Sequence, residues 1–307
     1  MSSQKKKKKT WLKVTGIILL LLVLGVGVYA YNVYSSLKST VATMNEPLKS
    51  QTDKRTSPVA LSNKDPFSVL MLGVDERPGD RGRSDTMIVL TINPNNNSVK
   101  MLSIPRDTRT EIVGHGTVDK INHAYAFGGV QMSVDTVQNF LNIPIDYYMK
   151  VNMQGFKDIV NAVGGVTVNN TLDFSYGGDH FATGNINLGG AQALNFVRMR
   201  KEDPRGDFGR QERQRQVIQA VLKEGASVSS LTNYSDIFAA ISKNVKTNVT
   251  FDEMVDIQKN YKSAASNLTQ MEIKETGTMI NGIYYGIVSD AEKQRLQNEE
   301  RAQLELK

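Results

Sequence analysis

Two aspartates lie at the ends of a short charged segment between two apolar runs. Asp75 follows the run from Phe67 to Val74, and Asp85 precedes the run from Thr86 to Ile92. In an α/β sheet, ligands collect outside the strand ends, and two carboxylates there can share a hard cation such as Mg²⁺ or Mn²⁺ with phosphate oxygens. An ordinary solvated turn is the alternative, because Gly-Asp and Asp-Glu pairs are common in turns.

A second charged pair, Arg106 and Asp107, directly follows the apolar run from Val99 to Ile104. If this run is also a strand, Arg106 reaches the same edge of the sheet as the two aspartates. The alternative is a turn in which Asp107 caps the next segment and pairs with Arg106.

Arginine is unusually dense between positions 198 and 215. The arginines of this stretch are Arg198, Arg200, Arg205, Arg210, Arg213 and Arg215. The planar guanidinium fork binds phosphate oxygens through two parallel hydrogen bonds and keeps its charge at neutral pH. The density of this cluster therefore predicts an anion site.

The spacing within the stretch predicts how these side chains are presented. Arg198 and Arg200 point the same way only where the chain is extended, so we expect the preceding helix to end near Phe196. Arg210 and Gln214 are four residues apart and share one face of a following helix. The N-terminus of that helix is itself an anion site.

The same stretch has an alternative interpretation as an exposed helix with patterned charges. Its acidic residues, which could neutralise most of the arginines, are Glu202, Asp203, Asp207 and Glu212. This alternative accounts better for Arg213 and Arg215 than for Arg198 and Arg200.

The remaining pattern predicts the elements that position these residues. Short runs rich in β-branched residues indicate strands at 67–74, 86–92, 99–104, 147–151, 165–168 and 271–275. Apolar residues spaced three and four apart indicate helices at 130–141, 153–163, 210–223, 234–245 and 251–264. Interleaved strands and helices favour an α/β sheet covered by helices.

Two further segments have less distinctive patterns. The string at 120–129 indicates a packed helix that ends in glycines. The charged tail at 290–307, with sparse apolar residues, indicates either a loosely docked helix or a disordered end.

The N-terminal region predicts a membrane anchor. Residues 1–13 form a basic stub, residues 14–32 an apolar segment and residues 33–64 a polar stalk that holds the domain off the membrane. The apolar segment approaches the ~20 residues that cross a bilayer and is longer than a secretory signal core. Cleavage near Ala30 is the alternative. Because lysines precede the segment, we expect a single-pass type II protein of the cell membrane, with the domain at 65–289 outside the cell.

Composition excludes several classes of protein. The net charge of +6 equals the number of lysines before the apolar segment, so the outer portion is neutral and no nucleic-acid partner is expected. The absence of cysteine excludes disulfides, thiol nucleophiles and zinc–thiolate sites. The three histidines are widely spaced and predict no metal cluster, so any metal should be bound by carboxylates.

Together with the anchor, several ordered motifs resemble the LytR-CpsA-Psr family, and within it the enzymes that transfer teichoic acid. The match spans about residues 65 to 285. Its motifs are Asp75 with Arg83-Ser84-Asp85, Ser-Ile-Pro-Arg-Asp-Thr at 103–108, Lys-Ile-Asn-His-Ala-Tyr-Ala-Phe-Gly-Gly at 120–129, Arg-Met-Arg-Lys-Glu-Asp at 198–203 and Arg-Gln-Glu-Arg-Gln at 210–214.

The resemblance implies an α/β/α sandwich whose central mixed sheet encloses a hydrophobic tunnel for a polyprenyl chain, with a pyrophosphate at the tunnel mouth. By the same resemblance, Asp75 and Asp85 correspond to ligands of Mg²⁺ or Mn²⁺. The side chains that correspond to phosphate ligands are Arg83, Arg106, Arg198, Arg200, Arg210 and Gln214.

The implied reaction is a phosphotransfer at the outer face of the membrane. A peptidoglycan hydroxyl, expected to be the 6-hydroxyl of N-acetylmuramic acid, attacks the sugar-bearing phosphorus of a polyprenyl-pyrophosphate-linked glycopolymer, expected to be wall teichoic acid. Polyprenyl phosphate leaves. Positioning and charge neutralisation should dominate catalysis, with Asp75, Asp85, Arg106 and Asp107 as catalytic candidates. The resemblance does not identify which carboxylate accepts the proton of the hydroxyl.

Two other functions fit the same residues. A membrane-tethered sensor of lipid pyrophosphate would regulate the envelope without turnover and would need no metal. A lipid pyrophosphatase would release free glycan phosphate even when an acceptor is present.

Overall fold

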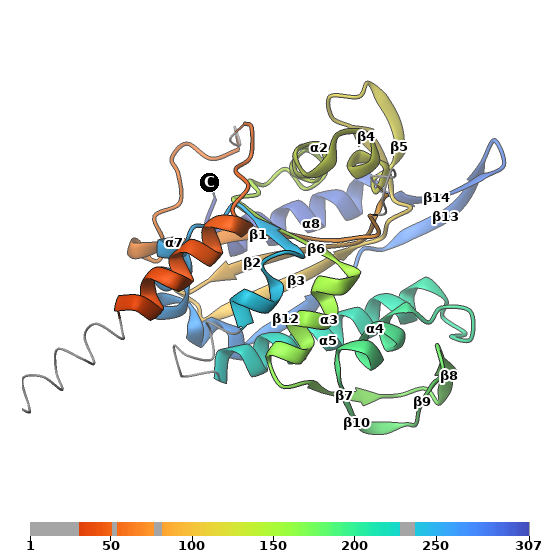
Figure 1. Ribbon diagram of the computed structural model, residues 1–307. Coiled ribbons are helices and arrows are strands. Elements are labelled where there is room, and N and C mark those ends of the chain that lie inside the picture. The colour runs from red at the N-terminus through yellow and green to blue at the C-terminus, as the bar shows by residue number, and fades with distance from the viewer. Residues whose placement is uncertain (1–30, 51–53, 77–81, 228–236, 307) are drawn as a thin grey trace, which may run out of the picture.

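A mixed sheet of six strands, in the order β11-β6-β1-β2-β3-β12, forms the centre of the molecule (Figure 1). The computed structural model describes residues 31–50, 54–76, 82–227 and 237–306. β1 runs antiparallel to β2 and parallel to β6, and β3 runs parallel to β12. The strands are β1 (Phe67–Val74), β2 (Ser84–Asn93), β3 (Ser98–Ile104), β6 (Tyr147–Asn152), β11 (Val245–Thr247) and β12 (Leu268–Met271).

Helices cover both faces of this sheet. On one face lie α2 (His123–Leu141) and α8 (Asp290–Gln303). The other face is covered by α3 (Met153–Ala162), α5 (Asp207–Ser227) and α7 (Phe251–Asn260). α4 (Gly190–Arg198) packs beside α3 and α5. The architecture is therefore an α/β/α sandwich with a central mixed sheet, as predicted.

Smaller elements decorate the sandwich. Four two-stranded ribbons pair β4 (Arg109–Ile112) with β5 (Thr117–Lys120), β7 (Val166–Asn170) with β10 (Gly184–Leu188), β8 (Phe174–Tyr176) with β9 (Asp179–Phe181), and β13 (Glu275–Ile280) with β14 (Ile283–Val288). Short helices are η1 (Leu61–Asn63) and η2 (Lys262–Ser266), and residues 237–241 are also helical. The β13–β14 hairpin projects from the molecule beside β4 and β5 (Figure 1).

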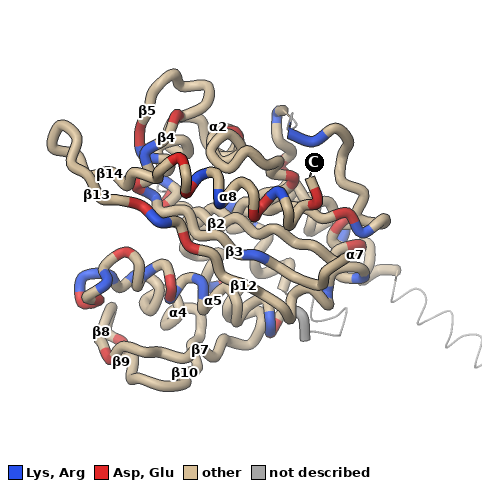
Figure 2. Tube along the Cα trace, turned by 180° about the vertical axis from the view of Figure 1, so that it is seen from behind, with Lys and Arg blue, Asp and Glu red and all other residues tan. Residues whose placement is uncertain are grey.

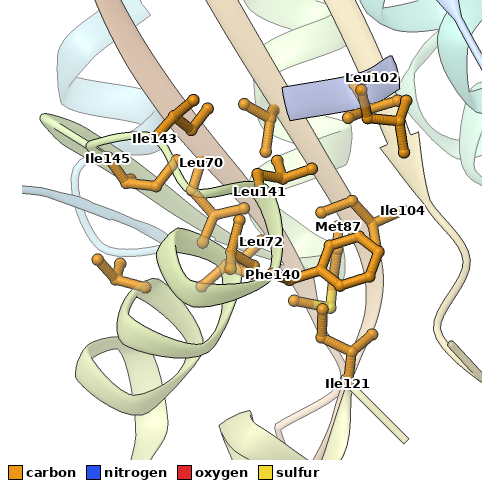
Figure 3. Packing of buried hydrophobic residues seen from close by; sticks show 14 of the residues in the cluster. Leu70, Leu72, Met87, Leu102, Ile104, Ile121, Phe140, Leu141, Ile143 and Ile145 are labelled. Carbon is orange, nitrogen blue, oxygen red and sulfur yellow. The ribbon is translucent and has the colours of Figure 1, made fainter. Parts of the chain in front are cut away.

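The core between the sheet and α2 is built by alternation along β1. Leu70 and Leu72 are fully buried and pack with Phe140 and Leu141 of α2 (Figure 3). Full burial of one such side chain contributes about 1.5–3 kcal/mol. This packing makes the strand ends of β1 and β2 a firm base for the side chains that follow them.

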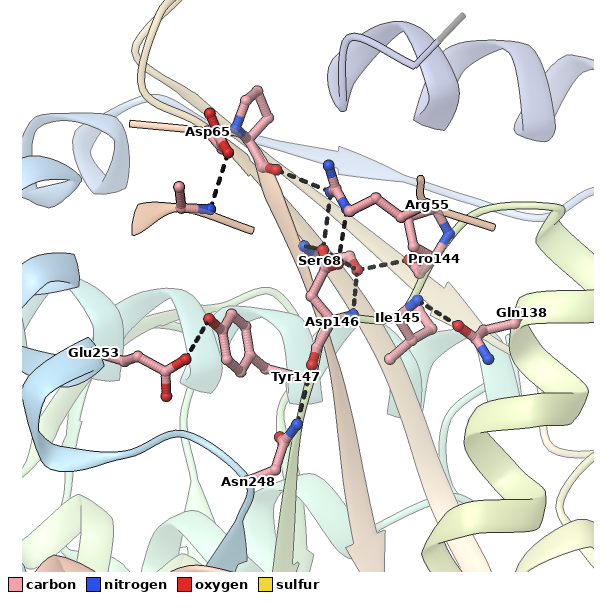
Figure 4. A network of polar contacts seen from close by, with 12 residues as sticks. Arg55, Asp65, Ser68, Gln138, Pro144, Ile145, Asp146, Tyr147, Asn248 and Glu253 are labelled. Carbon is pink, nitrogen blue, oxygen red and sulfur yellow. Dashed lines mark hydrogen bonds and ion pairs between the residues drawn. The ribbon is translucent and has the colours of Figure 1, made fainter. Parts of the chain in front are cut away.

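A polar network secures the edge of the sheet at the amino end of β1 (Figure 4). Arg55 donates to both carboxylate oxygens of Asp146, at 2.9 and 3.0 Å, and the backbone nitrogen of Ser68 donates to Asp146 at 2.9 Å. Ser68 Oγ also donates to the carbonyl of Pro144 at 2.7 Å. The network holds Arg55 against the sheet, at the edge opposite Asp75.

The prediction of a free stalk at 33–64 is wrong. Residues 31–44 form a helix, in which Leu37 and Val41 are buried against Phe251 of α7 and Met44 is buried against Val245. These apolar residues recur at helical spacing within a polar sequence, so this segment packs on the domain.

The predicted membrane segment at 14–32 lies outside the described residues except for its last two. Among the helices that the structure describes, none combines the length and apolarity of a bilayer span.

The charged tail is also corrected. α8 is an integral part of the sandwich, because Leu296 and Leu304 are buried in the same core as Leu72. The predicted boundary at residue 289 therefore does not separate a loosely docked end from the domain.

Several element boundaries differ from the predictions. Of the helix predicted at 234–245, residues 234–236 lie outside the described part of the chain, residues 237–241 are helical and residues 245–247 form β11. The strand predicted at 271–275 is wrong, because β12 ends at residue 271 and β13 begins at residue 275. The strand at 165–168 forms a ribbon with β10 outside the main sheet. The helix predicted to end in glycines instead begins at His123 and continues beyond a kink at Gly129.

A buried carboxyl group in α8, that of Glu300, should make the stability of the domain depend on pH. Glu300 is fully buried, its Oε2 accepts a hydrogen bond from Thr91 Oγ1 at 2.7 Å, and burial raises its pKa to about 7, although Thr91 and Lys100 oppose this shift. The native state therefore binds a proton that the unfolded chain loses at lower pH, so stability should fall as pH rises through this range. The free energy of unfolding should fall by on the order of 3 kcal/mol between about pH 5 and pH 8.

Glu300→Gln removes the titration and keeps an oxygen that accepts from Thr91. Urea unfolding at both pH values should show this loss in the parent and a much smaller one in the variant. Equal pH dependence in both proteins would contradict the assignment.

Candidate active site

A β-bulge presents the first pair of acids. Gly73 pairs with Thr86 and Val74 pairs with Ser84, so Asp85 is the extra residue between them. Such bulges redirect a side chain and occur often beside active sites. Asp85 therefore lies within β2, where a loop position was expected.

Contacts between the end of β1 and the start of β2 hold the backbone of Asp75 in place. Its backbone nitrogen donates to the carbonyl of Arg83 at 3.3 Å. Gly82 has φ of +69°, and a Cβ there would lie 2.1 Å from the carbonyl oxygen of Asp75. Only glycine fits this close approach, which keeps Asp75 and Arg83 on adjacent strand ends.

Arg106 links the second strand end to the first, as the sequence predicted. Its Nη1 donates to Asp85 Oδ1 at 2.9 Å, and its Nε lies 3.6 Å from Asp107 Oδ2. Lys120 Nζ binds the other oxygen of Asp107 at 2.6 Å. Burial opposes the charge of Arg106, but the hydrogen bond to Asp85 and the two nearby acids outweigh it and raise its pKa.

Arg210, in the first turn of α5, completes a crowded group of cations. Burial lowers the pKa of Arg210, and the charges of Arg106 and Arg200 lower it further, while Asp207 and Asp85 oppose the shift. Its Nη2 lies 2.6 Å from Asp207 Oδ1. Among the described residues, its buried Nε has no hydrogen-bond partner. A half-buried cation with an unused donor beside other cations favours an anion as ligand.

The other predicted phosphate ligands lie before β2, at the end of α4, in the α4–α5 connection and in α5. Arg198 is the last residue of α4, which ends later than the expected Phe196. Arg198 and Arg200 are both exposed on either side of Met199, which is buried. Arg83 is exposed as well. Gln214 is half-buried and lies one helical turn after Arg210.

Three arginines of the cluster have structural partners. Arg213 is buried and donates to Asp203 and to the carbonyl of Met199, both at 2.6 Å. Arg215 donates to Gln270 and Glu272 at 2.9 and 2.7 Å. Arg205 pairs with Glu212. Neutralisation by nearby acids, the alternative interpretation, therefore accounts for Arg205 and Arg213. The exposed helix that it assumed is wrong for Arg213 and Arg215, which are both buried, and Arg215 binds residues outside the stretch.

Two groups near the site were not predicted to be part of it. Asp207, expected only to neutralise charge, pairs with Arg210. Lys120, expected in a packed helix, is the last residue of β5 and binds Asp107. Figure 2 shows charged residues gathered on β4, β5, the base of β13–β14 and the α4–α5 connection, at one edge of the molecule.

Comparison with known proteins assigns the chain to a family. The model of the LytR_cpsA_psr family matches residues 31–302. The chain belongs to this family. The match includes both the helix over 31–44 and most of α8, which agrees with their packing in the LytR_cpsA_psr domain described above.

Similar proteins within the LytR_cpsA_psr family include a protein named as a teichoic acid transferase and two of known structure. The chain is 58% identical over 301 residues to "Polyisoprenyl-teichoic acid--peptidoglycan teichoic acid transferase TagU" of Bacillus cereus, covering 98% of this chain and 99% of the relative. The crystal structure of B. subtilis TagU matches with a TM-score of 0.66 and 53% identity, covering 80% of this chain and 99% of that one. TagT bound to LIIa-WTA matches with a TM-score of 0.75 and 31% identity, covering 85% and 100%.

Proposed function

We propose that this chain transfers wall teichoic acid from a polyprenyl-pyrophosphate-linked precursor to peptidoglycan, as a phosphotransferase. The observation that carries the proposal is Arg210, whose buried, unused Nε lies in a group with Arg106 and Arg200. This arrangement suits a pyrophosphate. The name of the Bacillus cereus relative, a teichoic acid transferase, supports the donor and the acceptor.

In the proposed reaction, an acceptor hydroxyl of peptidoglycan attacks the phosphorus that bears the sugar. A new phosphorus–oxygen bond forms to the acceptor, and the bond to polyprenyl phosphate breaks. Arg106, Arg210 and Gln214 would hold the phosphate oxygens from half-buried positions, with the exposed Arg83, Arg198 and Arg200 as further ligands. Charge-assisted hydrogen bonds of this kind contribute about 1.5–3 kcal/mol each.

Mg²⁺ or Mn²⁺ is proposed as the cofactor, with Asp75 and Asp85 as its protein ligands. Within the described residues, no three His, Cys, Asp or Glu side chains converge as a metal site. Mg²⁺ commonly uses one or two carboxylates and takes its other ligands from phosphates and water. Two acids on adjacent strand ends fit that pattern, and the bound ion would neutralise charge on the pyrophosphate.

A tunnel for the polyprenyl chain is proposed between the sheet and α5 with α7. Val69 and Met71 face these helices and stay only half-buried, although β1 has strands on both sides. On the other face, Leu70 and Leu72 are fully buried. The half-buried row continues through Gly73 toward Asp75.

Organic extraction of the purified domain, followed by mass spectrometry, would detect a retained polyprenyl phosphate.

The proposed location is the cell membrane, with the N-terminus inside and the domain outside. The lysines before the apolar segment support this orientation. Protease added to intact protoplasts should remove the domain, whereas digestion only after lysis would contradict the orientation.

A donor-fate assay separates the three candidate functions. The full chain is incubated with defined lipid-linked polymer and peptidoglycan fragments, with and without a chelator, and polyprenyl phosphate and free glycan phosphate are measured. A transferase releases polyprenyl phosphate only with an acceptor, and the chelator should stop it. Free glycan phosphate in the presence of acceptor would identify a pyrophosphatase, and no release at all would identify a sensor.

A further inference from the structure

We propose that the β13–β14 hairpin forms the acceptor side of the active site. In this proposal, Glu275 takes the proton of the attacking glycan hydroxyl, and Tyr284 holds the acceptor sugar. The inference rests on the proposed transfer and names the subsite for its second substrate, a polyhydroxylated glycan.

Backbone and side-chain contacts attach the base of the hairpin directly to the phosphate site. The nitrogen of Gly286 donates to the carbonyl of Asp107 at 2.9 Å, and Thr108 forms a β-bridge with Gly286. Thr108 Oγ1 donates to Glu275 Oε2 at 3.2 Å. Glu275 is therefore held against the segment that carries Arg106.

A pair of glycines makes room for two oxygen-bearing groups on one face of the hairpin. Gly277 lies opposite Gly286. A Cβ on Gly286 would lie 2.0 Å from Glu275 Oε2, and one on Gly277 would lie 2.7 Å from Tyr284 Oη. The carboxylate and the phenol thus lie over neighbouring stretches of bare backbone, and a side chain at either glycine would displace one of them.

The charges that face Glu275 come from two other elements. Burial raises the pKa of Glu275, Asp107 and Asp207 raise it further, and the Thr108 hydrogen bond opposes the shift. Asp107 and Asp207 also contact Arg106 and Arg210 of the phosphate site. A carboxylate with a raised pKa is a better general base near neutral pH.

Tyr284 is suited to bind a sugar beside this carboxylate. Burial raises its pKa, with Glu275, Asp107 and Asp207 adding to the shift, so the phenol remains a hydrogen-bond donor at neutral pH. The residue is nevertheless 46% exposed, and its cross-strand partner Met279 is 63% exposed. Exposed aromatic and apolar side chains on one face of a projecting arm favour contact with a ligand.

The proposed step balances without a further reactant. As the acceptor oxygen bonds to phosphorus, its proton moves to a carboxylate oxygen of Glu275. The bond from phosphorus to polyprenyl phosphate breaks with its electron pair, and Glu275 afterwards releases the proton to water.

Glu275→Gln tests the proton transfer, because glutamine keeps the size of the side chain and an oxygen for Thr108. General-base catalysis contributes about 10²–10⁴-fold, so transfer should fall at least about a hundredfold. Binding of a polyprenyl pyrophosphate probe should be unchanged. The parent should also lose activity as pH falls through the pKa of Glu275, and the residual activity of the variant should lack this limb.

Glu111→Gln is the matched control, because Glu111 is exposed on the adjacent β4 and should leave transfer unchanged. Tyr284→Phe provides a second test and should raise the KM for the acceptor about tenfold through loss of one hydrogen bond. Parental rate and pH profile in Glu275→Gln, together with parental KM in Tyr284→Phe, would overturn the inference and leave the proposed function intact. Failure of the parent itself to transfer polymer would overturn both.

Discussion

Arg210→Ala is expected to reduce transfer about a hundredfold or more while the domain stays folded. The half-buried guanidinium lies beside Arg106 and Arg200, and its buried Nε donates to no described residue. Among the described residues, its side chain forms one ion pair, with Asp207, which is itself 30% exposed. Loss of one donor to developing charge in an enclosed site costs about 2.7–4 kcal/mol of transition-state stabilisation.

Transfer rate, affinity for a polyprenyl pyrophosphate probe and melting temperature should be measured together. Both rate and affinity should fall, with little change in melting temperature. Arg205→Ala is the matched control, because Arg205 is 49% exposed and pairs with Glu212 at the surface, where ion pairs contribute little. Its Nε also lies 3.5 Å from Asp203, which keeps its closer partner Arg213 at 2.6 Å in this variant. If Arg205→Ala were as damaging as Arg210→Ala, general positive charge, and not a specific phosphate contact, would explain the effect.

Arg213→Ala is expected to destabilise the domain by about 3–5 kcal/mol, because it leaves the buried carboxylate of Asp203 without its main partner. The side chains of Arg213 and Asp203 are 4% and 1% exposed. Arg213 also donates to the carbonyls of Phe196 and Met199, so it joins the end of α4 to α5. The free energy of unfolding in urea measures this effect.

Arg200→Ala should show the reverse behaviour. Arg200 is exposed in the same connection, so its replacement should impair transfer and leave the free energy of unfolding nearly unchanged. Equal stability losses in Arg213→Ala and Arg200→Ala would mean that the proposed division between structural and phosphate-binding arginines is wrong.

The strand-end chemistry could be predicted because it is local in the sequence. Asp75, Asp85 and Arg106 each lie within two residues of a strong apolar run, and the central strands form almost where those runs predict. The bulge that turns Asp85 toward Arg106 depends on the register of two strands, which periodicity alone does not fix.

The predictions of a stalk and a loose tail at the two ends of the domain are wrong because the apolar residues of these two helices are sparse. Leu37 and Val41, like Leu296 and Leu304, lie among many polar residues, and their burial depends on distant partners such as Phe251. Average polarity predicted a stalk and a loose tail, whereas the helical spacing of these few residues would have indicated packed helices.

The contribution of the β13–β14 hairpin could not be predicted from local pattern alone. Glu275 and Thr108 are separated by 167 residues in the chain. A signal for the hairpin itself was present, because Asn281-Gly282 is a favoured two-residue turn and both residues have positive φ. What the turn cannot reveal is that the hairpin lies beside Asp107 and Asp207.

Transfer of polymer to peptidoglycan is tested most directly by detecting the covalent product. The full chain should be incubated with lipid-linked teichoic acid and peptidoglycan fragments, and the products analysed by mass spectrometry, with Arg210→Ala in parallel. The account predicts a phosphodiester joining the polymer to the glycan strand, formed by the parent and reduced about a hundredfold in the variant. Consumption of the donor without any joined product, or equal amounts of joined product from both proteins, would contradict it.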